Sequence, residues 1–455
     1  MSRFDRPEIL HLSFTDLSFE GKGVCKDNGR VIFVDGIFPG EEGDIEFTYQ
    51  RAGTLFGRVV KLTKTSPDRI QPKCPVCSTC GGCEFQQYAY KAQLAYKQKK
   101  VEEQFRKIGH MEIKALPTIG MESPYFYRNK IQVPFTRDNR GNVYCGFYKE
   151  NTHVIVPIEK CYIEDERAEP ILKAMRTLMK SMRIEPFDED SGEGVIRYAL
   201  IKTSKYFQDV MLVLVTGVDS FPSRNNFVHA LVEQCPQITT VVQNINSRHT
   251  NVILGDRTKT LYGKGFIRDT LCGVNFRIST KSFYQTNPIM TEILYKTAMD
   301  FAELTPNDIV FDAYSGIGTI GMIAAKQCKK GISVEIVPEA VRDAIANAKE
   351  NNILNFVSYA DDASSYISKM ARVGDHIDVL FMDPPRKGSD PRFLNAVKSL
   401  KPSRIVYVSC DPSTLARDVA YLSDKYAVGK IQPIDLFPQT FHVETVVRLT
   451  LRDDK

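Results

Sequence analysis

The chain has 455 residues, of which 43% are hydrophobic and 25% charged, ordinary values for a globular protein of about three domains. This composition excludes wholesale disorder and fibrous repeats, and a formal net charge of +5 permits an anionic partner without requiring one. The longest strongly apolar run, residues 210–215, is far shorter than the ~20 residues that span a bilayer. The charged N-terminus lacks the apolar segment of a signal peptide. We therefore expect a cytoplasmic protein.

The first 66 residues predict a small all-β unit. Short runs of β-forming residues, such as residues 31–34, alternate with turns that contain glycine. About five such strands suit a small barrel of the oligonucleotide-binding type. Two prolines, Pro67 and Pro72, then predict a linker. Residues 87–109, rich in Lys, Gln, Ala and Glu and ended by a glycine, predict a helix.

Two different patterns follow in the rest of the chain. Residues 125–279 mix strand-like runs with one helix-like stretch at residues 168–182, which predicts a mixed α+β region. From residue 283 onward, apolar strand-like runs alternate with helical stretches, and this alternation predicts βαβ units, a parallel sheet and an α/β fold. The strand-like runs are residues 309–311, 331–336, 378–382 and 404–409.

Cysteine and positive charge are unevenly distributed. Four of the eleven cysteines crowd into ten residues, at Cys74, Cys77, Cys80 and Cys83. Thiols stay reduced in the cytosol, so this cluster predicts a metal site before a disulfide framework.

Residues 197–281 contain eleven Lys or Arg and five Asp or Glu. A nucleic-acid contact would lie there, although a solvated basic face without a partner explains the excess almost as well.

Residues 312–321, Asp-Ala-Tyr-Ser-Gly-Ile-Gly-Thr-Ile-Gly, follow an apolar strand and open a helix. Glycines at such a turn let the backbone approach a nucleotide closely, and Glu335, at the end of the next strand, can hold ribose hydroxyls. This motif alone also fits NAD, or a merely structural turn. We favour S-adenosylmethionine, because Asp312 can face a cationic methyl donor and nothing upstream supplies a catalytic domain of dehydrogenase type.

Polar residues also follow later strands. Asp383 begins an Asp-Pro-Pro-Arg-Lys-Gly sequence, whose prolines fix a rigid turn that holds the carboxylate towards the crevice at the strand ends; a plain turn is the alternative. Cys410 directly follows the next strand and is placed like a nucleophile, although a lone cysteine is more often a small buried apolar residue. Glu444 is a candidate base.

Together, these motifs resemble the bacterial RNA (uracil-C5)-methyltransferases, and specifically the ribosomal RNA members with a TRAM domain and a 4Fe–4S cluster. Separately some of the motifs are weak, but in this order they are specific and they extend over nearly the whole chain. The matching sequences are Phe-Glu-Gly-Lys-Gly-Val at 19–24, Cys-Gly-Gly-Cys-Glu-Phe-Gln at 80–86, Ser-Phe-Tyr-Gln-Thr-Asn at 282–287, Asp-Pro-Pro-Arg-Lys-Gly at 383–388, Ser-Cys-Asp-Pro at 409–412 and Pro-Gln-Thr-Phe-His-Val-Glu at 438–444.

The resemblance implies three domains. Residues 1–66 would be a TRAM-like β-barrel that binds RNA, and residues 67–280 a mixed α+β domain with the iron–sulfur cluster and a role in RNA recognition. Residues 281–455 would be a Rossmann-like class I methyltransferase domain that uses S-adenosylmethionine. The expected partner is 23S rRNA with its target uridine flipped out of the stack. We expect a monomer without membrane contact.

By the same resemblance, Cys410 is the nucleophile and Glu444 the general base. Uracil C5 is too weak a nucleophile to take a methyl group unaided, so a thiolate adds at C6 and a base later removes the C5 proton. Phe283 is placed to line the target pocket, with a core position nearly as plausible. The residues implied in contact with the methyl donor are Gln285, Tyr314, Glu335, Asp362 and Asp383. Asp361 competes with Asp362 for its role.

The family pattern assigns the cluster ligands to Cys74, Cys80, Cys83 and Cys161. Cys77 departs from the simplest pattern. From spacing alone it could replace Cys161, and zinc could replace the cluster. The family pattern favours Cys161.

Two other functions stay open. A transfer-RNA uracil-C5-methyltransferase would share the chemistry, but those members typically lack the cluster and the TRAM barrel. A non-catalytic iron–sulfur protein that binds RNA would have a degenerate site, whereas the catalytic residues are intact here. The candidates for phosphate contacts in the basic middle segment are Lys202, Lys205, Arg257 and Lys259.

Overall fold

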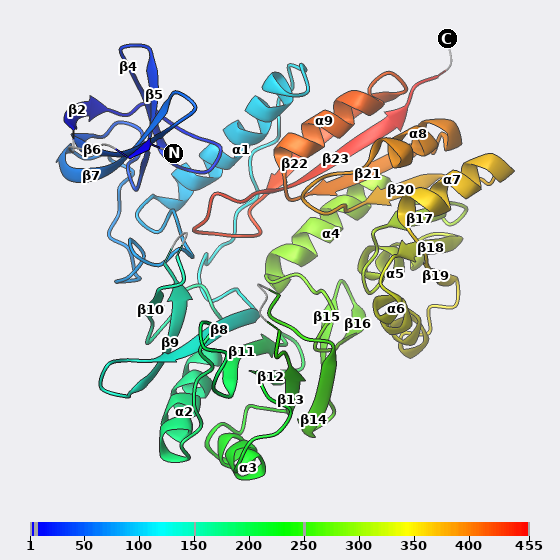
Figure 1. The fold of residues 1–455 in the computed structure, drawn as a ribbon. Helices are drawn as coiled ribbons and strands as arrows, with labels where there is room; N and C mark the ends of the chain where they lie inside the picture. Colours follow the sequence, from blue (N-terminus) through cyan, green and yellow to red (C-terminus); the bar gives the residue numbers. More distant parts are fainter. Residues whose placement is uncertain (1, 4–7, 150–151, 249–251, 454–455) are drawn as a thin grey trace.

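The computed structural model describes residues 2–3, 8–149, 152–248 and 252–453 (Figure 1). The N-terminal sheet forms because every second side chain in the first part of its two longest strands, β6 and β7, is buried. Its seven strands wrap into a half-barrel around an apolar core that includes Phe14, Ile45 and Phe47. The predicted all-β unit is therefore confirmed. Its strands are β1 (Ser2–Arg3), β2 (Ile9–Ser13), β3 (Asp16–Leu17), β4 (Gly23–Asp27), β5 (Arg30–Asp35), β6 (Glu42–Arg51) and β7 (Thr54–Lys64).

The middle of the chain forms a second seven-stranded sheet in the order β10-β9-β8-β11-β12-β13-β14. The apolar run that becomes β12 is buried along its whole length because the sheet has a core on each face. Val210, Leu212 and Leu214 pack with α2 and α3, whereas the residues between them join the core of the C-terminal part. The elements are β8 (Lys130–Arg137), β9 (Val143–Tyr148), β10 (Ile155–Pro157), α2 (Ala168–Ser181), β11 (Ile196–Thr203), β12 (Val210–Thr216), α3 (Arg224–Gln234), β13 (Thr240–Ile245) and β14 (Arg257–Tyr262).

The C-terminal part is a third seven-stranded sheet, in the order β19-β18-β17-β20-β21-β23-β22. The first five strands in this order are parallel, and β23 lies antiparallel between β21 and β22. The predicted alternation and parallel sheet are confirmed. The elements are α4 (Pro288–Ala302), β17 (Ile309–Ala313), α5 (Thr319–Ala325), β18 (Lys330–Glu335), α6 (Pro338–Glu350), β19 (Phe356–Ala360), α7 (Ala363–Val373), β20 (Val379–Met382), α8 (Pro391–Leu400), β21 (Arg404–Ser409), α9 (Pro412–Leu422), β22 (Tyr426–Ile434) and β23 (Glu444–Leu451).

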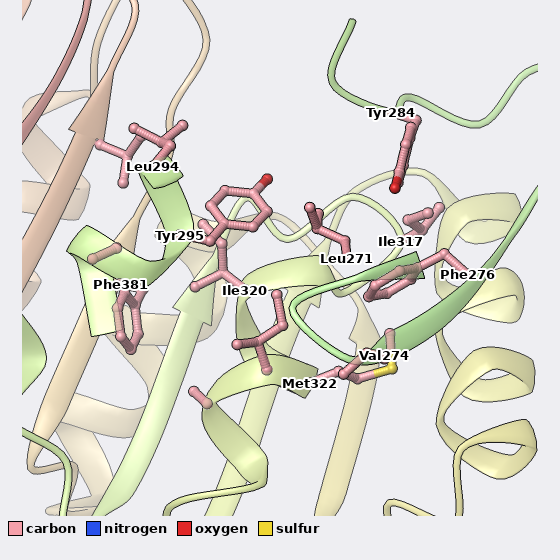
Figure 2. Close-up of a cluster of buried hydrophobic side chains, with 14 of the residues drawn as sticks. Leu271, Val274, Phe276, Tyr284, Leu294, Tyr295, Ile317, Ile320, Met322 and Phe381 are labelled. Atoms are coloured by element: carbon pink, nitrogen blue, oxygen red, sulfur yellow. The ribbon is translucent and has the colours of Figure 1, made fainter. Parts of the chain in front are cut away.

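A separate hairpin, β15 (Ile267–Leu271) and β16 (Val274–Ile278), joins the middle and C-terminal parts. Figure 2 shows its apolar residues facing the glycine-containing turn and α5. Leu271, Val274 and Phe276 belong to one buried cluster with Ile317 and Met322. This buried core holds the glycine-containing turn in place.

The helix predicted at residues 87–109 is α1 (Tyr90–Lys107). Figure 1 shows it between the N-terminal sheet and α9. Its residues Val101 and Phe105 share a buried cluster with Leu415 and Val419 of α9. After α1 the chain runs along the C-terminal sheet, where the backbone N–H of Leu116 donates to Ile431 O at 2.9 Å. The segment that follows the cysteines is thus packed against the sheet that carries the predicted catalytic residues.

Among the residues that the structure describes, none of the helices combines the length and the apolar character that crossing a lipid bilayer requires.

Candidate active site and cysteine pocket

The carboxyl ends of the parallel strands border one cavity of about 1000 Å³. Ligands in open α/β sheets bind at this edge because the strand-to-helix turns leave a crevice there. The structure brings together the two residues predicted for catalysis and the five that the family resemblance implies in contact with the methyl donor. These are Gln285, Tyr314, Glu335, Asp362, Asp383, Cys410 and Glu444.

The glycine turn supplies one wall of the cavity. Tyr314, Gly316 and Gly318 have φ values of 64°, 56° and 77°, and this left-handed backbone folds the chain sharply between β17 and α5. The Gly316 N–H donates to Glu335 Oε2 at 3.0 Å, and the Val337 N–H donates to Glu335 Oε1 at 2.9 Å. Nothing lies within 4 Å of the position that a Gly316 Cβ would take, so the backbone is open to a ligand.

Asp312 differs from its predicted role. Its side chain is not among the described residues that line the cavity. Instead it is buried beneath the turn, where Oδ2 accepts the N–H of Gly321 at 2.8 Å. The pKa of this carboxyl is raised to about 8, mainly by burial; the Asp383 and Glu335 charges add to the shift, whereas the Gly321 hydrogen bond opposes it. Asp312 therefore braces the start of α5 and does not face the donor directly.

The fit of this wall to a nucleoside-containing methyl donor rests on its polar atoms. Within the described chain, Ser315 Oγ is buried without a hydrogen-bond partner. The Glu335 carboxylate lines the cavity beside Gly316, where it can accept ribose hydroxyls. Asp362 also lines the cavity, at the N-cap of α7, and accepts the Ser365 N–H at 2.8 Å. Its neighbour Asp361 instead forms an ion pair with Lys369 at 2.9 Å, which favours Asp362 as the donor contact.

The opposite end of the cavity holds Cys410 and Glu444. Cys410 follows β21 and Glu444 opens β23, and these strands pair antiparallel with Val408 opposite Val446 and Ser409 opposite Thr445. The same register continued by one residue sets Cys410 opposite Glu444. A thiol and a carboxyl that lie 34 positions apart in sequence are thereby held side by side by main-chain hydrogen bonds.

Burial and mutual repulsion shape the acids of this end. Burial raises the pKa of Glu444 to about 8, and the Asp383 charge adds to the shift, whereas Arg386 opposes it. Burial alone raises the pKa of Asp383 to about 7. The pKa of the Cys410 thiol is raised to about 12, mainly by burial and next by repulsion from Glu444 and Asp383. A carboxyl that titrates near neutral pH is suited to proton transfer.

Three further residues complete this end of the cavity, and the sequence analysis gave a role only to Phe283. That side chain lines the cavity and is 65% exposed, so it is not a core residue. Arg386 and His442 also line the cavity. The pKa of His442 is lowered to about 4, mainly by burial and next by the Arg386 charge. Its imidazole is therefore neutral at pH 7. Arg386 and His442 stand inside the Asp-Pro-Pro-Arg and Phe-His-Val-Glu sequences, and these positions could have identified them as residues of the site.

A second, smaller cavity of about 90 Å³ lies beside the cysteine loop. Five thiols line it, including one from the distant segment before α2. Within the described residues, no three Cys, His, Asp or Glu side chains converge on one point as ligands of a single metal ion. These thiols are Cys74, Cys77, Cys80, Cys83 and Cys161.

The five thiols that line this cavity are donors that both a zinc ion and a 4Fe–4S cluster take. Zinc needs about four donors roughly 2.3 Å from one centre, whereas a 4Fe–4S cluster is held by four thiolates around a larger body. The Gln87 amide donates to Cys77 Sγ at 3.8 Å, and the Cys83 thiol has a hydrogen bond with the Gln86 side chain. Cys161 lies near Cys83, and burial followed by the Glu164 charge raises the pKa of its thiol.

The predicted phosphate contact at Lys202 is wrong. Its side chain is buried, and its Nζ donates to Ser279 O at 2.8 Å and to Ser282 O at 3.0 Å. Its amine therefore anchors the segment that leads into Phe283 and Gln285. Lys259 is exposed but forms an ion pair with Asp219 at 2.9 Å.

Comparison with known proteins agrees with this arrangement. The family model described as tRNA (Uracil-5-)-methyltransferase matches residues 231–452. An RNA methyltransferase of Oceanobacillus iheyensis is 41% identical and aligns over 98% of both chains. One from Listeria monocytogenes is also 41% identical, over 99% of both chains.

A solved structure gives the same picture. The tRNA (uracil-54, C5)-methyltransferase of Pyrococcus abyssi, crystallised with S-adenosyl-L-homocysteine, has a TM-score of 0.77 and 26% identity to this chain. The match extends over 97% of this chain and 100% of that one. The non-catalytic alternative is thereby set aside. The chain belongs to the family of S-adenosylmethionine-dependent RNA (uracil-5)-methyltransferases.

Proposed function

We propose that the protein methylates C5 of a uridine in 23S rRNA. In this reaction Cys410 forms a covalent bond to uracil C6, and Glu444 is the general base. The observation that carries this proposal is their juxtaposition on β21 and β23, at the end of the cavity opposite the glycine turn. A pyrimidine ring between the two side chains would present C6 to the thiol. Its C5 would then face the part of the cavity that Tyr314, Glu335 and Asp362 line.

The reaction uses Cys410 first and Glu444 afterwards. The Cys410 thiolate adds to C6, so that C5 gains the electron density to attack a methyl group. S-adenosylmethionine supplies that methyl group as the second substrate: the bond between its sulfur and the methyl carbon breaks, and S-adenosylhomocysteine leaves. Glu444 then takes the C5 proton, the released electron pair restores the C5–C6 double bond, and the C6–S bond breaks. The thiolate is regenerated and the uracil has gained one methyl in exchange for one proton.

Replacing each residue separately tests this order of events. Cys410→Ala should form neither methylated RNA nor a covalent complex. Glu444→Gln should still add to C6 and take the methyl group, but it cannot remove the C5 proton, so methylated RNA should stay attached to the protein. A denaturing gel with labelled RNA distinguishes the two. Turnover of Glu444→Gln at the wild-type rate would mean that another group is the base.

Support for ribosomal RNA comes from two parts of the chain outside the cavity. The N-terminal half-barrel resembles the TRAM type, and a cysteine pocket lies beside it in the chain. We propose that residues 1–66 bind the strand around the target, by phosphate contacts and base stacking. We also propose that the enzyme acts as a monomer.

Transfer RNA is the second candidate, and a specific observation favours it. The Pyrococcus abyssi enzyme is a tRNA methyltransferase, and its match over 97% of this chain includes most of the N-terminal sheet. That sheet by itself therefore does not distinguish the two substrates. Methyl transfer to purified 23S rRNA and to bulk tRNA, each lacking C5-methyluridine, decides between them. Faster transfer to tRNA would overturn the ribosomal assignment.

We further propose that Cys74, Cys80, Cys83 and Cys161 hold a 4Fe–4S cluster. Cys161 lines the same small cavity as the cysteines of the loop although it lies far from them in the sequence, which supports it as the fourth ligand. Anaerobically purified protein should contain about four iron and four sulfide per chain. Stoichiometric zinc without iron would refute this proposal.

A further inference from the structure

Helix α1 buries a polar face. Tyr90, Gln93, Lys97 and Lys100 follow one another at intervals of three, four and three residues, which places them on one side of the helix. Gln93 and Lys97 are fully buried, and Lys100 is only 6% exposed. Burying an amide and two amines costs free energy unless each finds a partner. An apolar face would pack the helix at less cost, so the partners of these side chains explain why they are there.

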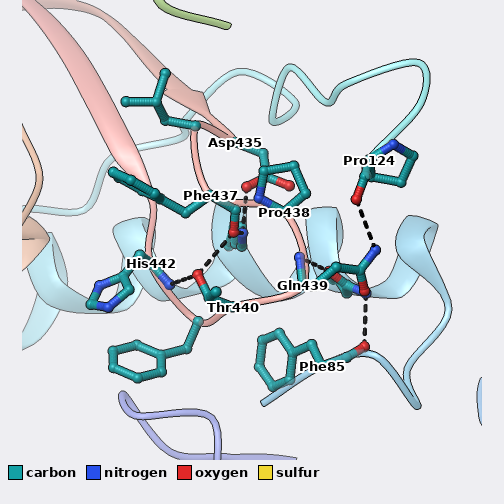
Figure 3. A network of polar contacts seen from close by, with 12 residues as sticks. Phe85, Pro124, Asp435, Phe437, Pro438, Gln439, Thr440 and His442 are labelled. Carbon is teal, nitrogen blue, oxygen red and sulfur yellow. Dashed lines mark hydrogen bonds and ion pairs between the residues drawn. The ribbon is translucent and has the colours of Figure 1, made fainter. Parts of the chain in front are cut away.

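All four side chains contact residues 435–441, the segment that leads into Glu444. Figure 3 shows Asp435, Phe437 and Gln439 of this segment. At its start, the Tyr90 hydroxyl donates to Asp435 Oδ2 at 2.8 Å, and Lys97 Nζ lies 2.5 Å from Asp435 Oδ1. Lys97 Nζ also donates to the carbonyl of Phe437 at 3.2 Å. A buried ion pair thus fixes the point where the segment leaves β22.

At the far end of the segment, Lys100 Nζ donates to the carbonyl of Phe441 at 2.9 Å. The same ammonium lies 3.9 Å from the ring centre of Phe19 and 4.7 Å from that of Phe441, within the range of a cation–π contact. Phe19 belongs to the turn between β3 and β4. The N-terminal sheet therefore contributes to the same contact as α1.

Gln439 lies in the middle, and each of its polar groups has a partner. Its N–H donates to Gln93 Oε1 at 3.1 Å, and its Oε1 accepts from Gln93 Nε2 at 3.1 Å. Its carbonyl accepts the N–H of Phe85 at 3.0 Å, and its Nε2 donates to Pro124 O at 3.4 Å. Phe85 lies two residues after Cys83, so the cysteine loop is tied directly to this segment.

The hydrogen bonds of Gln439 hold its backbone in a left-handed conformation. Its φ is +71°, a left-handed value that is strained for a residue with a side chain. Gln439 is buried and does not line the catalytic cavity among the described residues. Phe437, His442 and Glu444, on either side of it, do line the cavity. The hydrogen bonds of Gln439 therefore hold a strained backbone at the point where the chain turns towards Glu444.

We propose that Gln93, with Tyr90, Lys97 and Lys100, is a positioning residue for the proton-removal step. The polar face of α1 holds residues 435–441 so that the Glu444 carboxylate reaches the C5 proton of the uracil adduct. This inference rests on the proposed role of Glu444. It assigns the four side chains no contact with substrate. Loosening the segment should slow the loss of the C5 proton more than the earlier attack of Cys410, because β21 holds Cys410 independently.

The test compares Gln93→Leu with Gln98→Leu. Gln98 lies on the same helix, and its amide donates to Ala115 O at 3.2 Å, away from the segment. Gln93→Leu should lower kcat about 10- to 100-fold, the effect of a small misplacement of a reacting group. Covalent, methylated RNA–protein complex should accumulate during turnover. The rate of its formation and kcat/KM for RNA should stay near wild type, so the KM for RNA should fall together with kcat. Gln98→Leu should accumulate none.

Gln439→Gly keeps the proposal testable if Gln93→Leu does not fold. Glycine adopts a φ of +71° without strain, so this variant should fold normally while losing the side-chain bonds to Gln93 and Pro124. It should also accumulate the covalent complex. Wild-type release of RNA by Gln439→Gly and Gln93→Leu would overturn the inference. If Glu444→Gln itself releases RNA at the wild-type rate, the proposed base is wrong instead.

Discussion

The catalytic cavity and the cysteine pocket are held in different ways. The first is bordered by the ends of hydrogen-bonded strands, with Cys410 and Glu444 opposite each other by the pairing of β21 with β23. The second is lined by a loop of turns at residues 74–83 and by Cys161, which lies outside the helices and strands. A sheet fixes its site before any ligand binds. A loop lined by thiols gains much of its rigidity from the group that it holds.

Removing a cluster ligand should give the largest contrast between the two sites. Cys161→Ala should lose all of its iron, because a bound cluster needs four thiolates. The same variant should still bind S-adenosylmethionine, since the donor residues lie on the parallel strands. Iron content and equilibrium dialysis measure the two effects. Cys77→Ala is the matched control and should keep its iron. Loss of iron from Cys77→Ala alone would exchange the roles of the two cysteines.

The pH dependence should be the next largest effect, and it belongs to the catalytic cavity. Glu444 acts as a carboxylate and its pKa is raised to about 8, so the rate of adduct breakdown should rise up to tenfold per pH unit towards pH 8 and then level off. The stability should change in the opposite sense. A carboxyl whose pKa is raised by folding stabilises the protein below its unfolded value of 4.5 and progressively loses that contribution up to pH 8.

Glu444→Gln tests both halves of that prediction. Its amide does not titrate, so the thermal midpoint of the variant should fall less between pH 5 and pH 8 than that of the wild type, as followed by circular dichroism. A rate that is independent of pH in the wild type, measured on preformed adduct, would contradict the assignment of Glu444 as the base.

Lys202→Met should produce an intermediate effect, on stability and not on RNA affinity. The change leaves the carbonyls of Ser279 and Ser282 without the buried amine that they accept from. Each unsatisfied group costs about 1–3 kcal/mol, so we expect a loss of roughly 2–4 kcal/mol in the free energy of unfolding, measured with urea. The slope of log K for RNA against log salt should not change. A flatter slope would restore Lys202 as a phosphate contact.

The smallest effect should separate two adjacent carboxylates. Asp362→Asn keeps a side chain that caps a helix well but removes a charge beside the donor, so KM for S-adenosylmethionine should rise about fivefold, for a loss of ~1 kcal/mol. Asp361→Asn removes only the exposed pair with Lys369 and should leave that KM unchanged. Steady-state kinetics at saturating RNA compare the two. An equal rise in both variants would mean that neither residue has a specific contact.

Particular residues show how far the sequence alone could reach. The alternating strands and helices after residue 283 predicted the parallel sheet, and local motifs located Cys410, Asp383 and Glu444 in the chain. The motifs did not show that β23 inserts next to β21, because antiparallel insertion depends on contacts between distant segments. Asp312 was misjudged for a related reason. A carboxylate at a strand end faces either a ligand or the backbone turn, and only the fold decides between them.

Residues 90–100 show a different limit. The interval of three, four and three residues between Tyr90, Gln93, Lys97 and Lys100 is readable in the sequence. Polar side chains on one side of a helix usually face water, however, and here they face residues 435–441. Lys202 was misjudged in the same way, because a lysine in a basic stretch gives no sign that its amine ends inside the protein.

The place of β23 in the chain also has a consequence for synthesis on the ribosome. This strand contributes Glu444 and is the last strand in chain order that the structure describes, yet it lies between β21 and β22. Translation therefore delivers the half-barrel, the cysteine loop and the proposed nucleophile before it delivers the proposed base. A nascent chain that still lacks residues 444–451 has no Glu444 and an unfinished C-terminal sheet. The last step in the closing of this sheet is thus the step that brings Glu444 to Cys410.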